Sequence, residues 1–126
     1  MNLFTSWIAT NQAYILPWKN YLVSSWGLSP AAAEKAAILF ILLSLYNFAP
    51  KITSGYRSTE KQRELYNRWL AGDKTIHTPA RPGTSLHEKR QAIDIACNNA
   101  SQAAYIAHQI GLKTGLEYGD PVHFSL

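Results

Sequence analysis

The sequence predicts an α+β fold in which helices pack against a small, mostly antiparallel sheet. Apolar helix-like segments cluster in the first half of the chain and short strand-like segments in the second half, as is typical of this class. The chain has 126 residues, 47% of them apolar and 16% charged, which indicates a globular protein with one ordinary core. We expect a helical hydrophobic extension over residues 1–28 and a domain over residues 29–126 that carries the sheet. The two should form one compact unit.

The extension is expected to contain one or two short helices, broken near Pro17 and Gly27. Its one charged side chain is Lys19, and it holds three of the four tryptophans, Trp7, Trp18 and Trp26. Buried helices are the favoured interpretation. The alternative is contact of this Trp-rich segment with a membrane surface or a partner protein.

Two further observations bear on a membrane role. The uncharged run over residues 36–50 is 15 residues long, which is shorter than the ~20 residues that span a bilayer. No basic segment precedes an apolar stretch with a small-residue cleavage site, so we expect no secretory signal.

The next two elements follow from the start signals that precede them. Ser29 suits an N-cap and Pro30 a first helical position, which predicts a helix that ends by Asn47. Because this helix is apolar nearly all round, it should be central to the core. Residues 51–54 predict a strand.

The second half alternates short elements with turn-rich segments. A helix is expected from Thr59, which has capping-box spacing to Gln62, up to Gly72 as its C-cap. Residues 73–86 predict a loop by their Pro, Gly, Asp and Thr content. The remaining predicted elements are a strand over 91–96, a helix over 101–110, and short strands around 116–118 and 122–124.

Three metal-binding side chains lie close to or within these strands: His87, Asp94 and His123. Strand alternation places Asp94 on the face opposite Ile93 and Ile95. A buried carboxylate or imidazole is costly without a partner, and one shared divalent cation would satisfy all three groups. Two imidazoles and one carboxylate are typical of catalytic zinc, although cobalt or manganese fits the same set. Each residue alone has a plainer interpretation, as a hydrogen-bonded histidine or a turn aspartate, so the joint pattern carries the prediction of a small zinc hydrolase.

Hydrolysis also needs a base and a group that stabilises the oxyanion. Asp120 lies three residues before His123, with a proline between them, and is a candidate base. Glu117 is a second candidate, or could orient a histidine ligand. Arg57 follows a strand and precedes a helix, which suits binding of a substrate carboxylate or an oxyanion. His77 and His108 have no comparable context, and we interpret them as loop and helix-surface residues.

Three ordered motifs resemble one known family. They are Ser54-Gly55-Tyr56-Arg57-Ser58 with Gln62 downstream, Ser85-x-His87 with Ala92-x-Asp94, and Asp120-Pro121-Val122-His123-Phe124. Together they resemble the zinc D-alanyl-D-alanine carboxypeptidases, a family that includes phage endolysins cutting the L-alanyl-D-glutamate bond of peptidoglycan stem peptides. The resemblance covers about residues 50–126.

The resemblance implies a role for each matching residue. His87, Asp94 and His123 would be the zinc ligands, and Asp120 the general base. Arg57 would stabilise the transition state. Ser85, Gln62 and Tyr56 would belong to the substrate site.

One departure from the family pattern is Arg90, which stands where a glycine is usual. A backbone that needs a positive φ there would be strained by it. Another feature separates two branches of the family, because carboxypeptidase members commonly have Glu where this chain has Asp120. That difference favours a phage endolysin-type endopeptidase, with the D-alanyl-D-alanine carboxypeptidase as the alternative.

The expected substrate is the peptidoglycan stem peptide, and the expected place of action is the cell wall. The net charge of +4 suits an acidic envelope. Without a signal peptide, the protein would reach the wall through a holin-like route or as part of a virion. A non-catalytic virion protein on the same scaffold, working through residues 1–28, is the second hypothesis. Nucleic-acid binding is not expected, because the basic residues form no run and do not alternate with aromatic residues.

Overall fold

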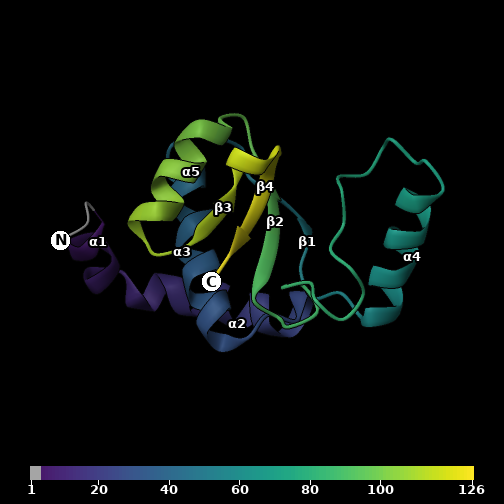
Figure 1. Cartoon of the computed structure of the whole chain (residues 1–126). Helices are drawn as coiled ribbons and strands as arrows, with labels where there is room; N and C mark the ends of the chain where they lie inside the picture. The colour runs from purple at the N-terminus through teal and green to yellow at the C-terminus, as the bar shows by residue number, and fades with distance from the viewer. Residues whose placement is uncertain (1–3) are drawn as a thin grey trace.

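A computed structural model describes residues 4–126, and these residues form five α-helices, one 3-10 helix and a four-stranded sheet (Figure 1). The α+β prediction is confirmed. The elements in chain order are α1 Thr5–Thr10, α2 Gln12–Trp26, α3 Pro30–Leu45, β1 Lys51–Ser54, α4 Thr59–Leu70, β2 Ala92–Ala96, α5 Ala100–Gln109, β3 Lys113–Gly115, η1 Leu116–Tyr118 and β4 Asp120–Ser125.

The sheet has the strand order β1-β2-β4-β3, and each neighbouring pair is antiparallel. In the pairing of β2 with β4, Asp94 lies directly opposite His123. Directly opposite residues on antiparallel strands have neighbouring side chains on one face. The sheet register alone therefore brings two of the predicted metal ligands together.

The hydrophobic core lies on the other face of β2, against α3 and α5. Ile93 and Ile95 are at most 2% exposed and belong to the same core cluster as Phe124. Helix α3 begins as predicted, because the Ser29 side chain accepts a hydrogen bond from the Ala32 amide and Pro30 occupies the first helical position. The strand alternation predicted for β2 is confirmed, and it leaves Asp94 on the face that does not carry the core.

The N-terminal helices differ from the prediction in one respect. The chain breaks at Asn11, between α1 and α2, and Pro17 lies inside α2. The carbonyl group that loses its helical hydrogen bond to Pro17 belongs to Ala13, which is exposed and can bond water instead. Gly27 ends α2 as predicted, with a left-handed φ of 69°.

Helix α2 packs against α3, and Ile15 and Leu22 of α2 belong to the common core. The first three residues of the expected 1–28 extension lie outside the described part of the chain. Within residues 4–126, no single helix is long and apolar enough to cross a membrane. Helices α2 and α3 meet that test only as a pair, bent by 120° at their junction.

Two local predictions were wrong. The N-cap of α4 is Ser58, whose hydroxyl accepts from the Lys61 amide, so the capping role predicted for Thr59 falls one residue earlier. Residues 116–118 form the 3-10 turn η1 and not a strand. Strands β3 and β4 pair antiparallel with Gly115 opposite Asp120, so the residues between must reverse the chain.

Candidate metal centre and its pocket

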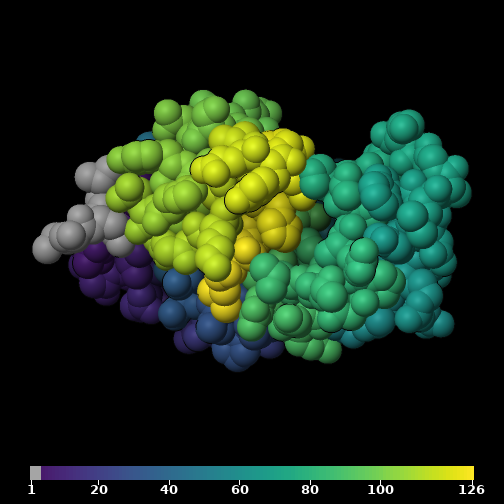
Figure 2. Space-filling view, viewed as in Figure 1, coloured from purple at the N-terminus to yellow at the C-terminus, as the bar shows by residue number. Residues whose placement is uncertain are grey.

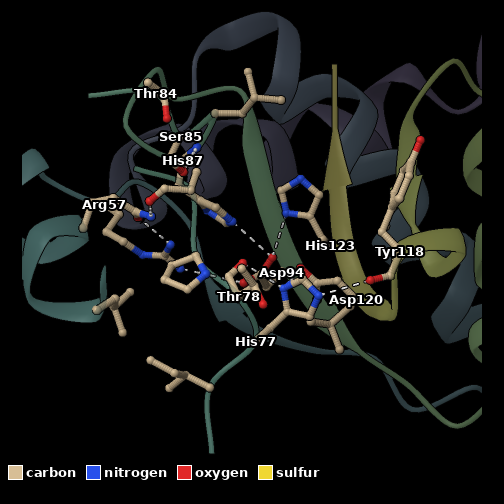
Figure 3. Close-up of a pocket in the computed structure, with 18 residues that line it drawn as sticks. Arg57, His77, Thr78, Thr84, Ser85, His87, Asp94, Tyr118, Asp120 and His123 are labelled. Carbon is tan, nitrogen blue, oxygen red and sulfur yellow. Dashed lines mark hydrogen bonds and ion pairs between the residues drawn. The ribbon is translucent and has the colours of Figure 1, made fainter. Parts of the chain in front are cut away.

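His87, Asp94 and His123 form one cluster at the middle of the sheet (Figure 3). The Nε2 atom of His87 is 3.2 Å from Asp94 Oδ1, and the Nδ1 atom of His123 is 3.4 Å from the same oxygen. One ligand atom from each residue lies within 4.8 Å of the others. Such a group can hold one metal ion between its three ligand atoms.

The Asp94 carboxylate supports this interpretation by its own environment. Its Oδ1 atom is buried and makes no hydrogen bond among the described residues. Burial alone would raise the pKa of the Asp94 carboxyl, but the His123 and His87 rings outweigh burial and hold the pKa well below its ordinary value. A buried, ionised oxygen facing two imidazole nitrogens is the donor set that a zinc ion needs, so these residues fit the metal.

His87 is held in the orientation that such a ligand requires. Its ring is buried, and Nδ1 donates to the Gly55 carbonyl at 2.8 Å, which directs Nε2 toward Asp94. Gly55 has to be a glycine, because a Cβ atom there would collide with the Trp26 carbonyl oxygen. The C-terminal end of α2 therefore sets the backbone that orients this ring.

Arg57 lies beside the cluster and is fixed by two neighbours. Its guanidinium group donates to Gln62 Oε1 at 2.9 Å and to the Ser54 hydroxyl at 3.0 Å. It also lies 3.9 Å from Asp94 Oδ2. Gln62 is 1% exposed, and its amide nitrogen donates to the Ala80 carbonyl at 2.8 Å. Gln62 thus joins Arg57 to the loop that follows α4.

A pocket of about 500 Å³ opens over the cluster. Figure 2 shows the hollow between the yellow C-terminal residues and the teal segment formed by α4 and the loop after it. The predicted site residues that line the pocket are Arg57, Gln62, Ser85, His87, Asp94, Asp120 and His123. The Ser85 hydroxyl accepts from the His87 amide at 3.2 Å, so it also supports the turn that carries this histidine.

Two predicted site residues do not line this pocket. Tyr56 is exposed on the far side of the Arg57 backbone, where its ring lies 3.9 Å from the Arg90 guanidinium carbon. Glu117 is exposed on η1. Neighbouring side chains in an extended segment point to opposite sides, so Tyr56 faces away when Arg57 faces the metal cluster. The substrate role of Tyr56 and the base role of Glu117 have no geometric support.

The structure adds two residues that the sequence analysis missed. His77, interpreted as a plain loop residue, lines the pocket next to Asp120. Glu88 accepts hydrogen bonds from the Gly83 and Ser85 amides and from the Thr59 hydroxyl. Burial would raise the pKa of Glu88, but these hydrogen bonds lower it. No local sequence signal marks His77, because its partner Tyr118 lies 41 residues along the chain. Glu88 combines the nearby Gly83 and Ser85 amides with the distant Thr59 hydroxyl.

Arg90 adopts the conformation that the sequence analysis identified as a source of strain, with φ at 64°. Its side chain compensates, because the guanidinium donates to the Gly27 carbonyl at 2.9 Å and stacks on Tyr56. The Arg90 carbonyl also accepts from the Ser29 amide at 2.9 Å. The turn after His87 is therefore attached to the junction of α2 and α3.

The comparisons with known proteins agree with this geometry. The sequence model of a family described as VanY, D-alanyl-D-alanine carboxypeptidase, matches residues 26–116. This segment contains Arg57, His87 and Asp94 and ends before Asp120 and His123. No curated protein matches the chain.

Three solved structures with this fold illustrate the likeness. The vancomycin-resistance D,D-pentapeptidase VanY from a VanB-type cassette, solved with Zn(II), is 20% identical, with a TM-score of 0.61 over 78% of this chain and 71% of that chain. VanYB in complex with D-alanine-D-alanine is 20% identical, with a TM-score of 0.62 over 78% and 70%. DacB from Streptococcus pneumoniae D39 is 24% identical, with a TM-score of 0.59 over 78% and 65%. At these identities the likeness shows the fold.

Proposed function

Because the chain belongs to the D-alanyl-D-alanine carboxypeptidase family, we propose that it removes the terminal D-alanine from peptidoglycan stem peptides. The chain is a zinc metallopeptidase that acts on peptidoglycan in the cell wall. The observation that carries the proposal is the orphaned Asp94 Oδ1 between two histidines in a pocket that also holds Arg57 and Asp120. The crystallised VanYB complex with D-alanine-D-alanine supports the choice of bond.

Zinc would be held by His87 Nε2, Asp94 and His123 Nδ1, the atoms that converge in the cluster. When bound, zinc supplies Lewis acidity, which polarises a carbonyl group and lowers the pKa of a coordinated water to about 7. The Gly55 carbonyl keeps the proton of the His87 ring on Nδ1, and so leaves Nε2 free as a ligand.

Asp120 is the proposed proton carrier. Its carboxylate lines the pocket near the cluster and is part-exposed. There it accepts a proton from the attacking water and then donates that proton to the amine that leaves when the amide bond breaks. This is general base and then general acid catalysis by one group.

Arg57 is the proposed electrostatic partner of the developing oxyanion. Its guanidinium is held by Gln62 and Ser54 before substrate arrives, so no reorganisation is needed when negative charge develops. We propose that Ser85 lies along the bound stem peptide, whereas Gln62 acts mainly through Arg57, because both ends of its amide already have protein partners.

A second candidate is the L-alanyl-D-glutamate endopeptidase expected from the sequence. The family match and the solved relatives favour the carboxypeptidase instead. The observation that favours the endopeptidase is Asp120 itself, because carboxypeptidase members of the family commonly have glutamate at this position.

Contact of the N-terminal helices with a membrane surface or a virion protein is also a proposal. It is supported by apolar side chains on α2 that are more than a third exposed: Tyr14, Leu16, Tyr21 and Val23. Sedimentation with vesicles of anionic lipid tests the membrane form. A Leu16→Ser, Val23→Ser variant should sediment less than the wild type, and equal sedimentation of the two would contradict it.

Digestion of purified peptidoglycan, followed by mass spectrometry, tests the proposed bond. We expect chelator-sensitive release of free D-alanine from pentapeptide stems, and only a low residual rate of release in an Asp120→Asn variant. Chelator-sensitive release of stems cut after L-alanine would establish the endopeptidase. Intact peptidoglycan after treatment with folded, zinc-loaded protein would refute both and favour a non-catalytic virion role.

A further inference from the structure

His77 makes contacts across the pocket that a plain loop residue would not make. It lies in the loop between α4 and β2 and lines the pocket. Its Nε2 atom is 3.2 Å from the Tyr118 carbonyl oxygen. Its Nδ1 atom is 3.1 Å from the Thr78 carbonyl oxygen and 3.8 Å from Asp120 Oδ2. Figure 3 shows the ring beside Asp120, with Tyr118 next to it.

These contacts join two segments that are far apart in the sequence. A carbonyl oxygen only accepts, so the contacts with Thr78 and Tyr118 are each hydrogen bonds when the ring nitrogen that makes them carries a proton. Tyr118 lies 41 residues along the chain from His77, in the turn that leads into β4. Gln62 already fastens the same loop to α4 through the Ala80 carbonyl. His77 fastens it on the other side of the pocket.

The contact with His77 bears on the position of the Asp120 carboxylate. Its side chain is 26% exposed at the start of β4, and the Nδ1 atom of His77 lies 3.8 Å from its Oδ2 atom. A carboxylate at a pocket rim without a partner would turn into solvent, and a displacement of about 1 Å can cost a catalytic group on the order of 100-fold in rate.

We propose that His77 is a positioning residue that latches the loop after α4 to the turn before β4 and holds the Asp120 carboxylate toward the pocket. This inference rests on the proposed function, since Asp120 is the proton carrier there. His77 makes no contact with the metal ligands that would give it a place among them.

The kinetic test uses zinc-loaded, full-length protein and stem pentapeptide as substrate. His77→Ala should lower kcat about 10-fold or more while KM changes less than about 2-fold and zinc content stays equal to wild type. In an Asp120→Asn background the same change should cost less than about 2-fold, because His77 acts through Asp120. His108→Ala, a change at an exposed position on α5, is the matched control and should leave kcat unchanged.

A conservative variant, His77→Gln, distinguishes the loss of the contact with Tyr118 from the mere loss of a side chain. The amide of His77→Gln can still donate to the Tyr118 carbonyl, so this variant should recover part of kcat relative to His77→Ala. Equal kcat in wild type and His77→Ala, or an undiminished effect in the Asp120→Asn background, would overturn the positioning role.

Limited trypsin digestion tests the latch without relying on activity. Lys74 is exposed in the loop, three residues before His77. We expect faster cleavage after Lys74 in His77→Ala than in wild type, His77→Gln or His108→Ala. Equal cleavage in all four would overturn the latch. If the wild type hydrolyses no stem peptide, the proposed function and the role toward Asp120 fail together, and the trypsin result still decides the latch.

Discussion

The Asp94 carboxylate is the group in the pocket whose burial costs free energy unless a cation is bound. A buried acceptor without a hydrogen bond costs about 1–3 kcal/mol, and more when it is charged. Asp94 Oδ1 is such an atom, and the two neighbouring imidazole nitrogens face it at 3.2 and 3.4 Å. A cation among these groups removes the cost, so metal binding and folding stability should be coupled.

Zinc should therefore raise the melting temperature of the wild type. A ligand that binds only the folded state stabilises it by about 4 kcal/mol when the free ligand concentration is 1,000 times its Kd. Asp94→Ala should melt at the same temperature with and without zinc, because a ligand and its charge are lost. Differential scanning calorimetry with zinc and with chelator measures both. A zinc-induced shift of equal size in Asp94→Ala would contradict the assignment.

Gly55→Ala should weaken zinc binding from outside the ligand set. The added Cβ collides with the Trp26 carbonyl, and relief of that collision displaces the Gly55 carbonyl that orients His87. Loss of such an orienting partner typically costs 10–100-fold in metal affinity. Gly72→Ala is the control, because an added Cβ atom there meets nothing within 4 Å, and its φ of 96° makes the substitution strained for a reason unrelated to the His87 ring. Isothermal titration with zinc should separate the two variants, and equal zinc affinities would refute the role of Gly55.

Helix α4 and the loop after it form the outer wall of the pocket, and Gln62 is the connection between them. Its buried amide accepts from Arg57 and donates to the Ala80 carbonyl. Glu88 performs a similar task at the end of the loop, where it accepts from the Gly83 and Ser85 amides. The wall is thus held by side-chain hydrogen bonds rather than by a strand or a core.

Gln62→Ala should lower the free energy of unfolding by about 1–3 kcal/mol, since it removes both hydrogen bonds of a side chain that is 1% exposed. It should also lower the rate of hydrolysis, because Arg57 loses one of its two anchors. Urea denaturation and D-alanine release measure the two effects. Arg63→Ala, an exposed change on the same helix, should stay within about 0.5 kcal/mol of wild type. A Gln62→Ala variant as stable as this control would refute the bridge.

The elements that could be predicted from sequence are those fixed by local signals. The alternation of Ile93, Asp94 and Ile95 predicted which face of β2 carries the carboxylate, and Ser29 with Pro30 predicted the start of α3. The turn at 116–118 was predicted as a strand, because its apolar side chains suit a strand and only the pairing of β3 with β4 forces a reversal there. The role of His77 could not be predicted, since Tyr118 and Asp120, its partners across the pocket, lie more than 40 residues along the chain.

At the level of the whole molecule, the N-terminal helices are built into the site. Trp26 of α2 accepts from the Tyr56 amide at 2.7 Å, and Gly27 accepts from Arg90. Both contacts lie beside residues that position His87. Trp26 and Gly27, the first two residues of the family match, therefore connect the C-terminal end of α2 to the site.

Two variants of Arg90 separate the side-chain contacts of this residue from its backbone strain. Arg90→Ala and Arg90→Gly lose the same contacts and differ in the strain at this position. Arg90→Ala keeps the left-handed backbone and loses the bond to Gly27 and the stacking on Tyr56, together about 1–2 kcal/mol. Arg90→Gly loses the same contacts but relieves about 1 kcal/mol of backbone strain. Urea denaturation should find Arg90→Gly the more stable of the two. Equal stabilities would show that the positive φ carries no cost.

The most direct test of the account is a zinc titration of chelator-stripped protein while D-alanine release from stem pentapeptide is followed. We expect no release without zinc, a linear rise to one zinc per chain, and no release at any zinc concentration from Asp94→Asn. Hydrolysis by the stripped protein, or a zinc-saturated wild type that releases nothing, would contradict the claim that His87, Asp94 and His123 form the centre of a peptidase.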